Sequence, residues 1–592
     1  MRKKNGIAVL MAAVLTMTSV LPVAGADFSA GAEYVEEPAE LEVFVGEEEQ
    51  KPEEEKPEEM PESEEEAVFS SEVEFTDEEE EPELFSSAAK ANTSASKITS
   101  CQGYSKGKIR IQAKVAATVK SVDQYYYLFA VNPYTQKLGK KIAKVEKPDG
   151  KGKVITFMLE TAGHPEYVLS QYAIGVKTKK ANKISSYTRI SDTSYVSYPE
   201  KTASNQDAYA LPATKKGLQT TNFQELKNTK SKTAFFNLPV SILLTKNAET
   251  VPYKYNGKTY YFNKIGGYTN LVSQCNKNGI QVTGQIILDY TSATKSLTAT
   301  GRQVSGANYY AWNTKNTASR LKMEALFSFI GELFGSKNCY VSNWILGNEV
   351  NTPKPWHYAG NMSKADFIAN YSDTFRSLYN AVRSKKAGAR VFICVDHYWN
   401  MTVQGYAAKD LVDSFARRIK TLQKGVNWNL AYHAYPFPLT DPRFWSGKNS
   451  HLMTNSSSSG VISLNNLNAL TNYIKKTYGS NTRILLSEQG FTSTKGQEVQ
   501  GAALSLGYYI AACNPMVDGF IIRSYADASH EVAQGLAMGI KGKKAFQVFT
   551  NMDSSKGLSY TKTYLTKQVG KKWSSKVPNY STKRLYSMYR VS

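Results

Sequence analysis

The chain has 592 residues, of which 41% are hydrophobic and 12% aromatic, and its formal net charge is +20. It is too long for one ordinary domain, and its apolar content excludes a wholly disordered protein. The charge is unevenly spread: residues 27–84 hold 26 acidic side chains and two lysines, whereas residues 85–592 hold 67 Lys and Arg against 26 Asp and Glu. The sequence therefore predicts a basic folded body preceded by an acidic segment.

Residues 1–26 have the features of a secretory signal peptide. Three basic residues at positions 2–4 precede an uncharged apolar run over 6–23, and small residues at 24–26 form a cleavage site. The alternative is an uncleaved membrane anchor, but threonines at 16 and 18 and Pro22 make the run a poor spanning helix. No second long apolar run follows, so we expect no membrane span after cleavage. The expected protein is secreted or extracellular, and associated with the cell surface non-covalently.

The sequence predicts no metal site and no cofactor. The five cysteines are scattered without a C-x-x-C pair, so neither a zinc knuckle nor a thioredoxin-type redox site is indicated. One disulfide is compatible with this pattern, but we expect buried thiols that act as small apolar residues. The histidines at 357, 397 and 433 lack a metal-ligand spacing such as H-E-x-x-H.

Residues 27–94 are rich in Glu, Pro and Ser, with acidic runs at 53–55 and 78–81. Such a segment repels itself and buries too little apolar surface to offset its ordering entropy, so we predict a disordered acidic linker. Two roles stay open for it. It is a solvated spacer, or it is a tether that screens the basic body at low salt.

Residues 95–200 show a hydrophobic period of two. Ile109, Ile111 and Val115 alternate with charged and polar residues, and turn signals such as Asn132-Pro133 separate further apolar runs. Short strands without a convincing helix predict a small all-β sandwich, an accessory domain. A carbohydrate-binding module and a purely structural module are both compatible with this pattern.

Residues 201–592 alternate between strand-like and helix-like patterns. Helical stripes cover residues 323–334, 367–382, 411–422 and 464–474. The pattern predicts an α/β fold, a (β/α)8 TIM barrel, with a doubly wound open sheet as the alternative. The phosphate-binding motifs G-x-G-x-x-G and G-x-x-x-x-G-K-[ST] are absent, which removes the usual nucleotide reasons for the open sheet. Eight short apolar runs end near Leu218, Leu238, Leu288, Asn348, Val395, His433, Ser487 and Arg523.

Two of these apolar runs end in a single glutamate, Glu349 after the fourth and Glu488 after the seventh. Only eight Glu occur from residue 201 onward, so two of them at strand ends are more than chance placement would suggest. Glycoside hydrolysis needs such a pair, one carboxyl to protonate the leaving oxygen and another to attack or to activate water. The alternative is that both are structural acids that cap the core with salt bridges. We predict that they are catalytic.

At these residues the chain resembles the clan A glycoside hydrolases, a superfamily of retaining barrels with glutamates after strands four and seven. Asn348-Glu349 matches the acid/base motif, and Glu488-Gln489-Gly490 matches the nucleophile motif. The segment Tyr432-His433-Ala434-Tyr435-Pro436 looks like the one that follows the sixth strand in this clan. The resemblance covers roughly residues 210–550. With the preceding sandwich, the chain also resembles secreted bacterial barrel proteins whose substrate is unassigned.

The resemblance implies a role for each matching residue. Glu488 would be the nucleophile, held by a hydrogen bond from Tyr435. Glu349 would be the acid/base, with a raised pKa in the free enzyme. Asn348 would bind the hydroxyl beside the anomeric carbon, and His433 would line the site near both glutamates.

Two departures from the clan concern the innermost sugar site. No Arg ends the first or the second predicted strand. The eighth ends in Ser524-Tyr525-Ala526-Asp527, where many clan members carry Trp. Tyr525 is therefore the candidate sugar platform.

Four of the seven tryptophans, at 312, 356, 399 and 445, fall just past a predicted strand end. Aromatic faces stack on the C–H faces of pyranose rings, whereas the alternative is that loop tryptophans anchor loops to the barrel rim. The densest aromatic cluster follows the fifth strand. There Trp399 and His397 are predicted to contact the sugar.

The sequence thus predicts a retaining glycoside hydrolase that acts on a polysaccharide or oligosaccharide. The alternatives are a catalytically inactive carbohydrate-binding barrel, a protein whose basic body attaches to anionic cell-wall polymers, and a barrel enzyme of another reaction class. Nucleic acid is not an expected partner, because the basic residues are spread along the chain rather than gathered in a recognisable module. Spacing rules indicate neither the sugar nor the linkage.

Overall fold

The structure is a computed structural model that describes residues 96–116, 121–147, 153–180 and 183–588. The predicted signal peptide over 1–26 and the predicted acidic linker over 27–94 lie outside the described residues. All described residues belong to one compact unit. Within them, no helix combines the length and apolar character that a membrane span requires. The domain bounds at 95–200 and 201–592 stay a prediction.

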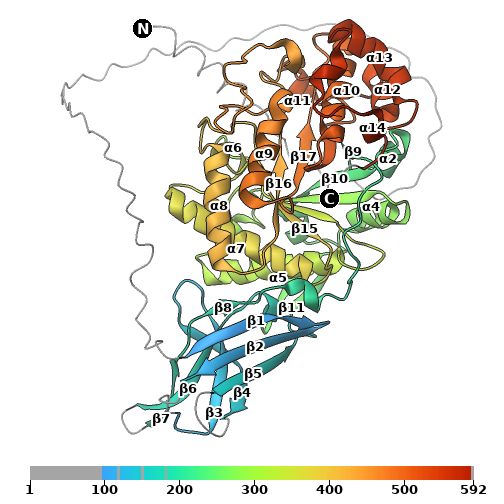
Figure 1. The fold of residues 1–592 in the computed structure, drawn as a ribbon. Coiled ribbons are helices and arrows are strands. Elements are labelled where there is room, and N and C mark those ends of the chain that lie inside the picture. The colour runs from blue at the N-terminus through green and yellow to red at the C-terminus, as the bar shows by residue number, and fades with distance from the viewer. Residues whose placement is uncertain (1–95, 117–120, 148–152, 181–182, 589–592) are drawn as a thin grey trace, which may run out of the picture. The chain divides into compact units, whose positions relative to one another are not determined.

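The N-terminal part is the predicted β-sandwich (Figure 1). One antiparallel sheet has the order β1-β2-β5, and the other has the order β4-β3-β6-β7, with β8 paired to β6. Ile109 and Ile111 of one sheet share a buried core with Leu128 and Ile174 of the other, which is why alternate residues are apolar. The strands are β1 (Lys97–Ser105), β2 (Lys108–Val115), β3 (Tyr125–Val131), β4 (Leu138–Glu146), β5 (Lys153–Glu160), β6 (Gln171–Lys180), β7 (Lys183–Arg189) and β8 (Ser194–Tyr195).

The C-terminal part is a closed barrel of eight parallel strands, so the predicted TIM barrel is confirmed and the open sheet is excluded. Each predicted apolar run forms one barrel strand. The lumen is filled by a small cluster that includes Phe235, Ile345, Phe392 and Leu485, as expected for a packed barrel rather than a pore. The strands are β9 (Lys216–Gln219), β10 (Thr233–Pro239), β13 (Gln281–Ile287), β14 (Asn343–Leu346), β15 (Arg390–Val395), β16 (Trp428–Tyr432), β17 (Ile484–Gln489) and β18 (Val517–Ile522).

Helices surround the barrel, and the hairpin β11 (Thr250–Tyr255) and β12 (Lys258–Asn263) interrupts the connection after β10. The four predicted helical stripes lie in α5, α7, α8 and α9. Asn316 and Ser363 cap α5 and α7 by accepting hydrogen bonds from backbone N–H groups, which fixes where these helices begin. The helices are α2 (Phe223–Asn228), α3 (Val240–Leu244), α4 (Gly266–Lys277), α5 (Thr317–Leu333), α6 (Pro353–Trp356), α7 (Lys364–Arg383), α8 (Ala408–Leu422), α9 (Leu467–Tyr478), α10 (Gln497–Cys513), α11 (Ser529–Val532), α12 (Lys544–Asn551), α13 (Gly557–Gln568) and α14 (Thr582–Leu585).

Buried polar contacts join the sandwich to α7. The side-chain amide of Asn380 donates to the carbonyl oxygens of Val168 and Val196 at 2.8 and 3.0 Å. Arg376 donates to the Leu169 carbonyl oxygen at 3.1 Å. Because these groups are buried, breaking the contact would leave unsatisfied donors, so the sandwich is a fixed part of this unit.

Candidate active site

The turn after β14 brings Glu349 to the carboxyl end of the barrel. Gly347 and Glu349 both adopt positive φ angles, 72° and 36°. The backbone is held there by hydrogen bonds from Thr352 N–H to the Glu349 carbonyl oxygen at 2.7 Å and from Val350 N–H to the Cys394 carbonyl oxygen at 2.9 Å. A left-handed conformation costs a non-glycine residue about 1–3 kcal/mol and concentrates at functional sites. The strained turn fixes the position of Glu349 at the carboxyl end of β14.

Glu488 lies near the end of β17, with 12% of its side chain exposed. The Tyr435 hydroxyl donates a hydrogen bond to Glu488 Oε1 at 2.6 Å, which is the contact expected from the sequence. Arg523, the first residue after β18, donates to the same oxygen at 3.3 Å. Two donors on one oxygen fix the orientation of the carboxylate and favour its ionised form.

His433 connects the two glutamates. Its Nδ1 lies 2.7 Å from Glu349 Oε1, and its Nε2 lies 4.0 Å from Glu488 Oε2. Nε2 also contacts Cys394 Sγ at 3.4 Å. Because a single imidazole ring reaches both carboxyls, Glu349 and Glu488 share one end of the barrel.

The pKa values of the two glutamates shift in opposite directions. Burial raises the pKa of Glu349, and the Asp396 and Glu488 charges add to this, although His433 opposes it. Burial also acts to raise the pKa of Glu488, but His433, Arg523 and Tyr435 outweigh it and lower that pKa below its usual value. At a pH between these two pKa values the site holds one protonated and one ionised carboxyl, as an acid and a nucleophile require.

The positive charge of His433 is stabilised by its neighbours. Burial would lower the pKa of His433, but Cys394, the Glu488 charge and the hydrogen bond to Glu349 raise it well above the usual value. A protonated His433 donates from Nδ1 to Glu349 Oε1. The acidic proton of Glu349 is then left on the other oxygen, Oε2, where it is free for a substrate.

Asn348 is oriented by the third strand. The Asn348 side-chain oxygen accepts a hydrogen bond from Gln285 Nε2 at 3.0 Å. The Gln285 Nε2 group also donates to the Gly347 carbonyl oxygen at 2.8 Å. Among the described residues, Asn348 Nδ2 has no acceptor. The amide is thus positioned to donate a hydrogen bond outward, as binding of a sugar hydroxyl requires.

The prediction for Trp399 is wrong. Its side chain is fully buried, its Nε1 donates to the Ser457 carbonyl oxygen at 3.1 Å, and its ring contacts Tyr432 and Tyr473 edge to face. Trp399 thus anchors the loop after β15 to β16 and α9. It offers no free face to a sugar.

His397 is 3% exposed, and among the described residues neither of its ring nitrogens has a hydrogen-bond partner. Burial lowers its pKa. The ring packs against Tyr398 and Phe437, and it lies close enough to His433 for that residue to act on its pKa. The adjacent Asp396 accepts hydrogen bonds from Asn351 Nδ2 and Thr352 Oγ1 at 2.7 and 2.6 Å, so it organises the loop after β14.

Tyr525, the predicted sugar platform, packs against Phe546 of α12, with ring centroids 6.3 Å apart. No described contact brings it to the glutamates. Two of the loop tryptophans have their partners elsewhere: Trp312 packs edge to face on Phe327 of α5, and Trp445 lines a different cavity.

Sequence reasoning missed Arg523 and Tyr309. The clan resemblance implies an arginine at the end of the first or second strand. In this chain Arg523 instead follows the eighth strand, where it pairs with both Glu488 and Glu531 of α11. Burial raises the pKa of Tyr309 to about 12, and the charges of Arg523 and Glu488 both act on it, so this side chain lies within electrostatic range of the nucleophile. Its ring pairs with Trp356 at 5.9 Å. The signal available for Arg523 was its position directly after an apolar strand.

The described residues contain no group of three or more His, Cys, Asp or Glu side chains arranged to hold a metal ion. The described cysteines form no disulfide, and four of the five are buried. The thiol of Cys394 belongs to the site through its contact with His433.

A family of unknown function (DUF5722) matches residues 208–576. Curated proteins contain no match to the sequence. Among solved structures, the chain is similar to a family 39 glycoside hydrolase from Bacteroides cellulosilyticus, with 13% identity and a TM-score of 0.38, covering 76% of this chain and 81% of that one. It is similar to the CBM22-1 and GH10 modules of endo-1,4-β-D-xylanase 10B from Clostridium thermocellum, with 11% identity and a TM-score of 0.37, covering 77% and 93%.

A third similar structure is a β-glucuronidase from Bacteroides uniformis, with 10% identity and a TM-score of 0.34. The match covers 77% of this chain and 51% of the β-glucuronidase, so the chain spans about half the length of that enzyme. The similar structures from families 39 and 10 are clan A glycoside hydrolases, and at 13% and 11% identity the likeness concerns the fold alone.

Proposed function

The chain belongs to a family of unknown function (DUF5722), and we propose that it is a secreted glycoside hydrolase that cleaves a polysaccharide or oligosaccharide with retention of configuration. One observation carries the proposal. Glu349 and Glu488 end two barrel strands, share His433, and have pKa values shifted in opposite directions. Two acids with a purely structural role at the barrel rim would not require pKa values shifted in opposite directions.

In the first step, the ionised Glu488 attacks the anomeric carbon while Glu349 gives its proton to the leaving oxygen. The bond to the leaving group breaks as the glycosyl–enzyme ester forms. Tyr435 and Arg523 hold Glu488 Oε1, so Oε2 is the free attacking oxygen. This assignment follows from the hydrogen bonds, because an oxygen that accepts from two donors is the weaker nucleophile.

In the second step, the ionised Glu349 takes a proton from water, whose oxygen attacks the anomeric carbon and releases Glu488. His433 keeps Glu349 in place through both steps. Its donation from Nδ1 suits each protonation state, because Glu349 Oε1 is an acceptor in both. Asn348 Nδ2 is the donor for the hydroxyl next to the reacting carbon.

The test compares Glu349→Ala and Glu488→Ala on aryl glycosides and on a polysaccharide panel. Without Glu488 no ester forms, so activity should fall to background on every substrate. Without Glu349 the loss should be large for poor leaving groups and small for an activated aryl glycoside, whose phenolate leaves without protonation. Glu498→Ala, which removes a partly exposed glutamate paired with two lysines, is the matched control.

Azide distinguishes the roles of the two glutamates. With Glu349→Ala it should give a glycosyl azide of retained configuration, and with Glu488→Ala the inverted one. Exchanged products would reverse the assignment. If the wild type binds sugars but cleaves none, the protein is instead an inactive carbohydrate-binding barrel.

A further inference from the structure

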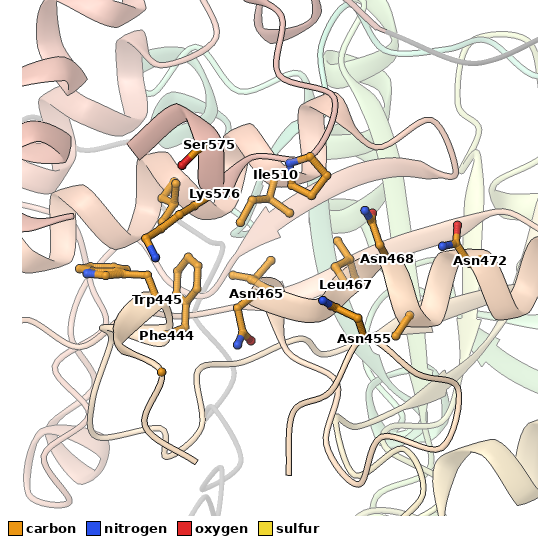
Figure 2. A pocket seen from close by; sticks show the side chains of 15 residues that line it. Phe444, Trp445, Asn455, Asn465, Leu467, Asn468, Asn472, Ile510, Ser575 and Lys576 are labelled. Carbon is orange, nitrogen blue, oxygen red and sulfur yellow. The ribbon is translucent and has the colours of Figure 1, made fainter. Parts of the chain in front are cut away.

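A cavity of about 500 Å³ lies apart from the glutamate pair (Figure 2). Its walls come from the loop after β16, the start of α9, the middle of α10 and the 3-10 turn Trp573–Lys576. Neither Glu349 nor Glu488 lines it. The volume is within the range of about 300–1,000 Å³ that small-molecule sites occupy.

Asparagines dominate the polar lining of this cavity. Asn468 and Asn472 are four residues apart on α9, so they share one face, and Asn465 lies in the 3-10 turn Leu464–Asn466 that precedes this helix. Asn455 adds a fourth amide from the preceding loop. Among the described contacts, the amides of Asn455, Asn465 and Asn472 have no hydrogen-bond partner. An amide presents both donors and an acceptor, which is the combination that sugar hydroxyls match.

An aromatic wall closes one end of the cavity. In Figure 2, Phe444 and Trp445 stand at the opposite end from Asn472, and Lys576 reaches toward them. Trp445 Nε1 donates to the Gln568 carbonyl oxygen at 3.2 Å, and the Phe444 ring meets the indole edge to face at 5.4 Å. The indole N–H is therefore already satisfied. What Trp445 contributes to the cavity is part of its ring surface, and aromatic surface of this kind suits stacking on a pyranose ring.

The polar lining of this cavity consists mainly of uncharged groups. Ser463 and Asn466 form a capping box at the turn that begins α9, with Ser463 N–H donating to Asn466 Oδ1 at 2.8 Å. This start of the helix is therefore not an open set of N–H groups for a phosphate. Lys576 is the one charged side chain in the lining, and no carboxylate accompanies it.

The cavity is also tied to the active-site segment. Ser463 Oγ donates to the Tyr435 carbonyl oxygen at 2.7 Å, and Tyr435 holds Glu488. We propose that the cavity is a second glycan site, which binds a neutral oligosaccharide by stacking on Trp445 and by hydrogen bonds to the asparagines of the lining. This site performs no catalysis, and it does not require that the protein hydrolyse its ligand.

The test is calorimetric titration of the full chain carrying Glu488→Ala with β-1,4-linked hexasaccharides of glucose, xylose and mannose. Adding Trp445→Ala should weaken binding at one site by about tenfold or more. Tyr261→Ala removes an exposed aromatic ring outside this cavity and should change nothing. Because Trp445 also anchors a loop, the double variant Asn465→Ala/Asn472→Ala provides a second measurement that leaves the packing intact.

Loss of one site in both cavity variants, with retention in Tyr261→Ala, supports the proposal. It is overturned if none of the hexasaccharides binds, or if the cavity variants bind as the parent does. If binding depends on Trp445 but the wild-type protein cleaves no glycoside, the proposed hydrolase is overturned and the second site still stands.

Discussion

Replacing His433 by glutamine should move both limbs of the pH–rate profile to higher pH. Glutamine keeps a donor for Glu349 but removes the positive charge. The acid limb reports ionisation of Glu488, whose pKa His433 lowers, so that limb should rise. The alkaline limb reports loss of the Glu349 proton. His433 also opposes the rise of that pKa, so this limb should move upward as well.

The size of the shift follows from the distances. At the 4.0 Å between His433 Nε2 and Glu488 Oε2, one unit-charge pair is worth about 4 kcal/mol at an effective dielectric constant of about 20, or about 3 pH units at most. Arg523 remains as a second cation beside Glu488, and the three groups titrate together, so we expect about 1–2 units.

The measurement is kcat/KM against pH on an activated aryl glycoside. Tyr435→Phe is the matched control, because it removes a hydrogen bond to Glu488 alone and should raise only the acid limb. If His433→Gln left both limbs in place, or moved the same single limb as Tyr435→Phe, the shared-imidazole account would be refuted.

Three further variants test the surroundings of the site. Arg523→Met leaves Glu531 buried without its cation and should cost about 3–5 kcal/mol in chemical denaturation while raising the acid limb of the pH–rate profile. Burial lowers the pKa of Lys216 to about 8, below the value of about 10.4 in an unfolded chain, so the unfolded state binds more protons between these pH values. The unfolding free energy should therefore gain up to about 1.4 kcal/mol per pH unit across that window from this residue, and Lys216→Met should abolish the gain. Gly347→Ala places a Cβ 2.9 Å from His357 Nδ1 at a φ of 72°, so both the melting temperature and the activity should fall.

The barrel could be predicted from the sequence because each strand is a short apolar run that ends at a turn signal. The strands of such a barrel are buried on both faces, so their apolar residues form continuous runs instead of alternating with polar residues. The glutamates at 349 and 488 stand out for the same reason, since each interrupts an apolar run at its carboxyl end. Parallel strands bring these ends together once the barrel closes.

The surroundings of the glutamates depend on contacts between distant segments, which local patterns do not reveal. Trp399 looks like an exposed loop aromatic until Tyr473 of α9 packs across it. Arg523 follows a strand, but its partners are fixed only when β18 lies beside β17 and α11 folds back with Glu531. Strand ends were thus predictable, whereas the direction of each loop side chain was not.

The charges within the site argue for an uncharged sugar at the proposed cleavage point. Arg523 is shared between Glu488 and Glu531, and His433 lies between Glu349 and Glu488. An acidic sugar would have to compete with Glu488 for one of these cations. Such competition would raise the pKa of the nucleophile and weaken its orientation at the same time. The cations that prepare Glu488 for attack are therefore the reason to expect that the substrate carries no charge of its own there.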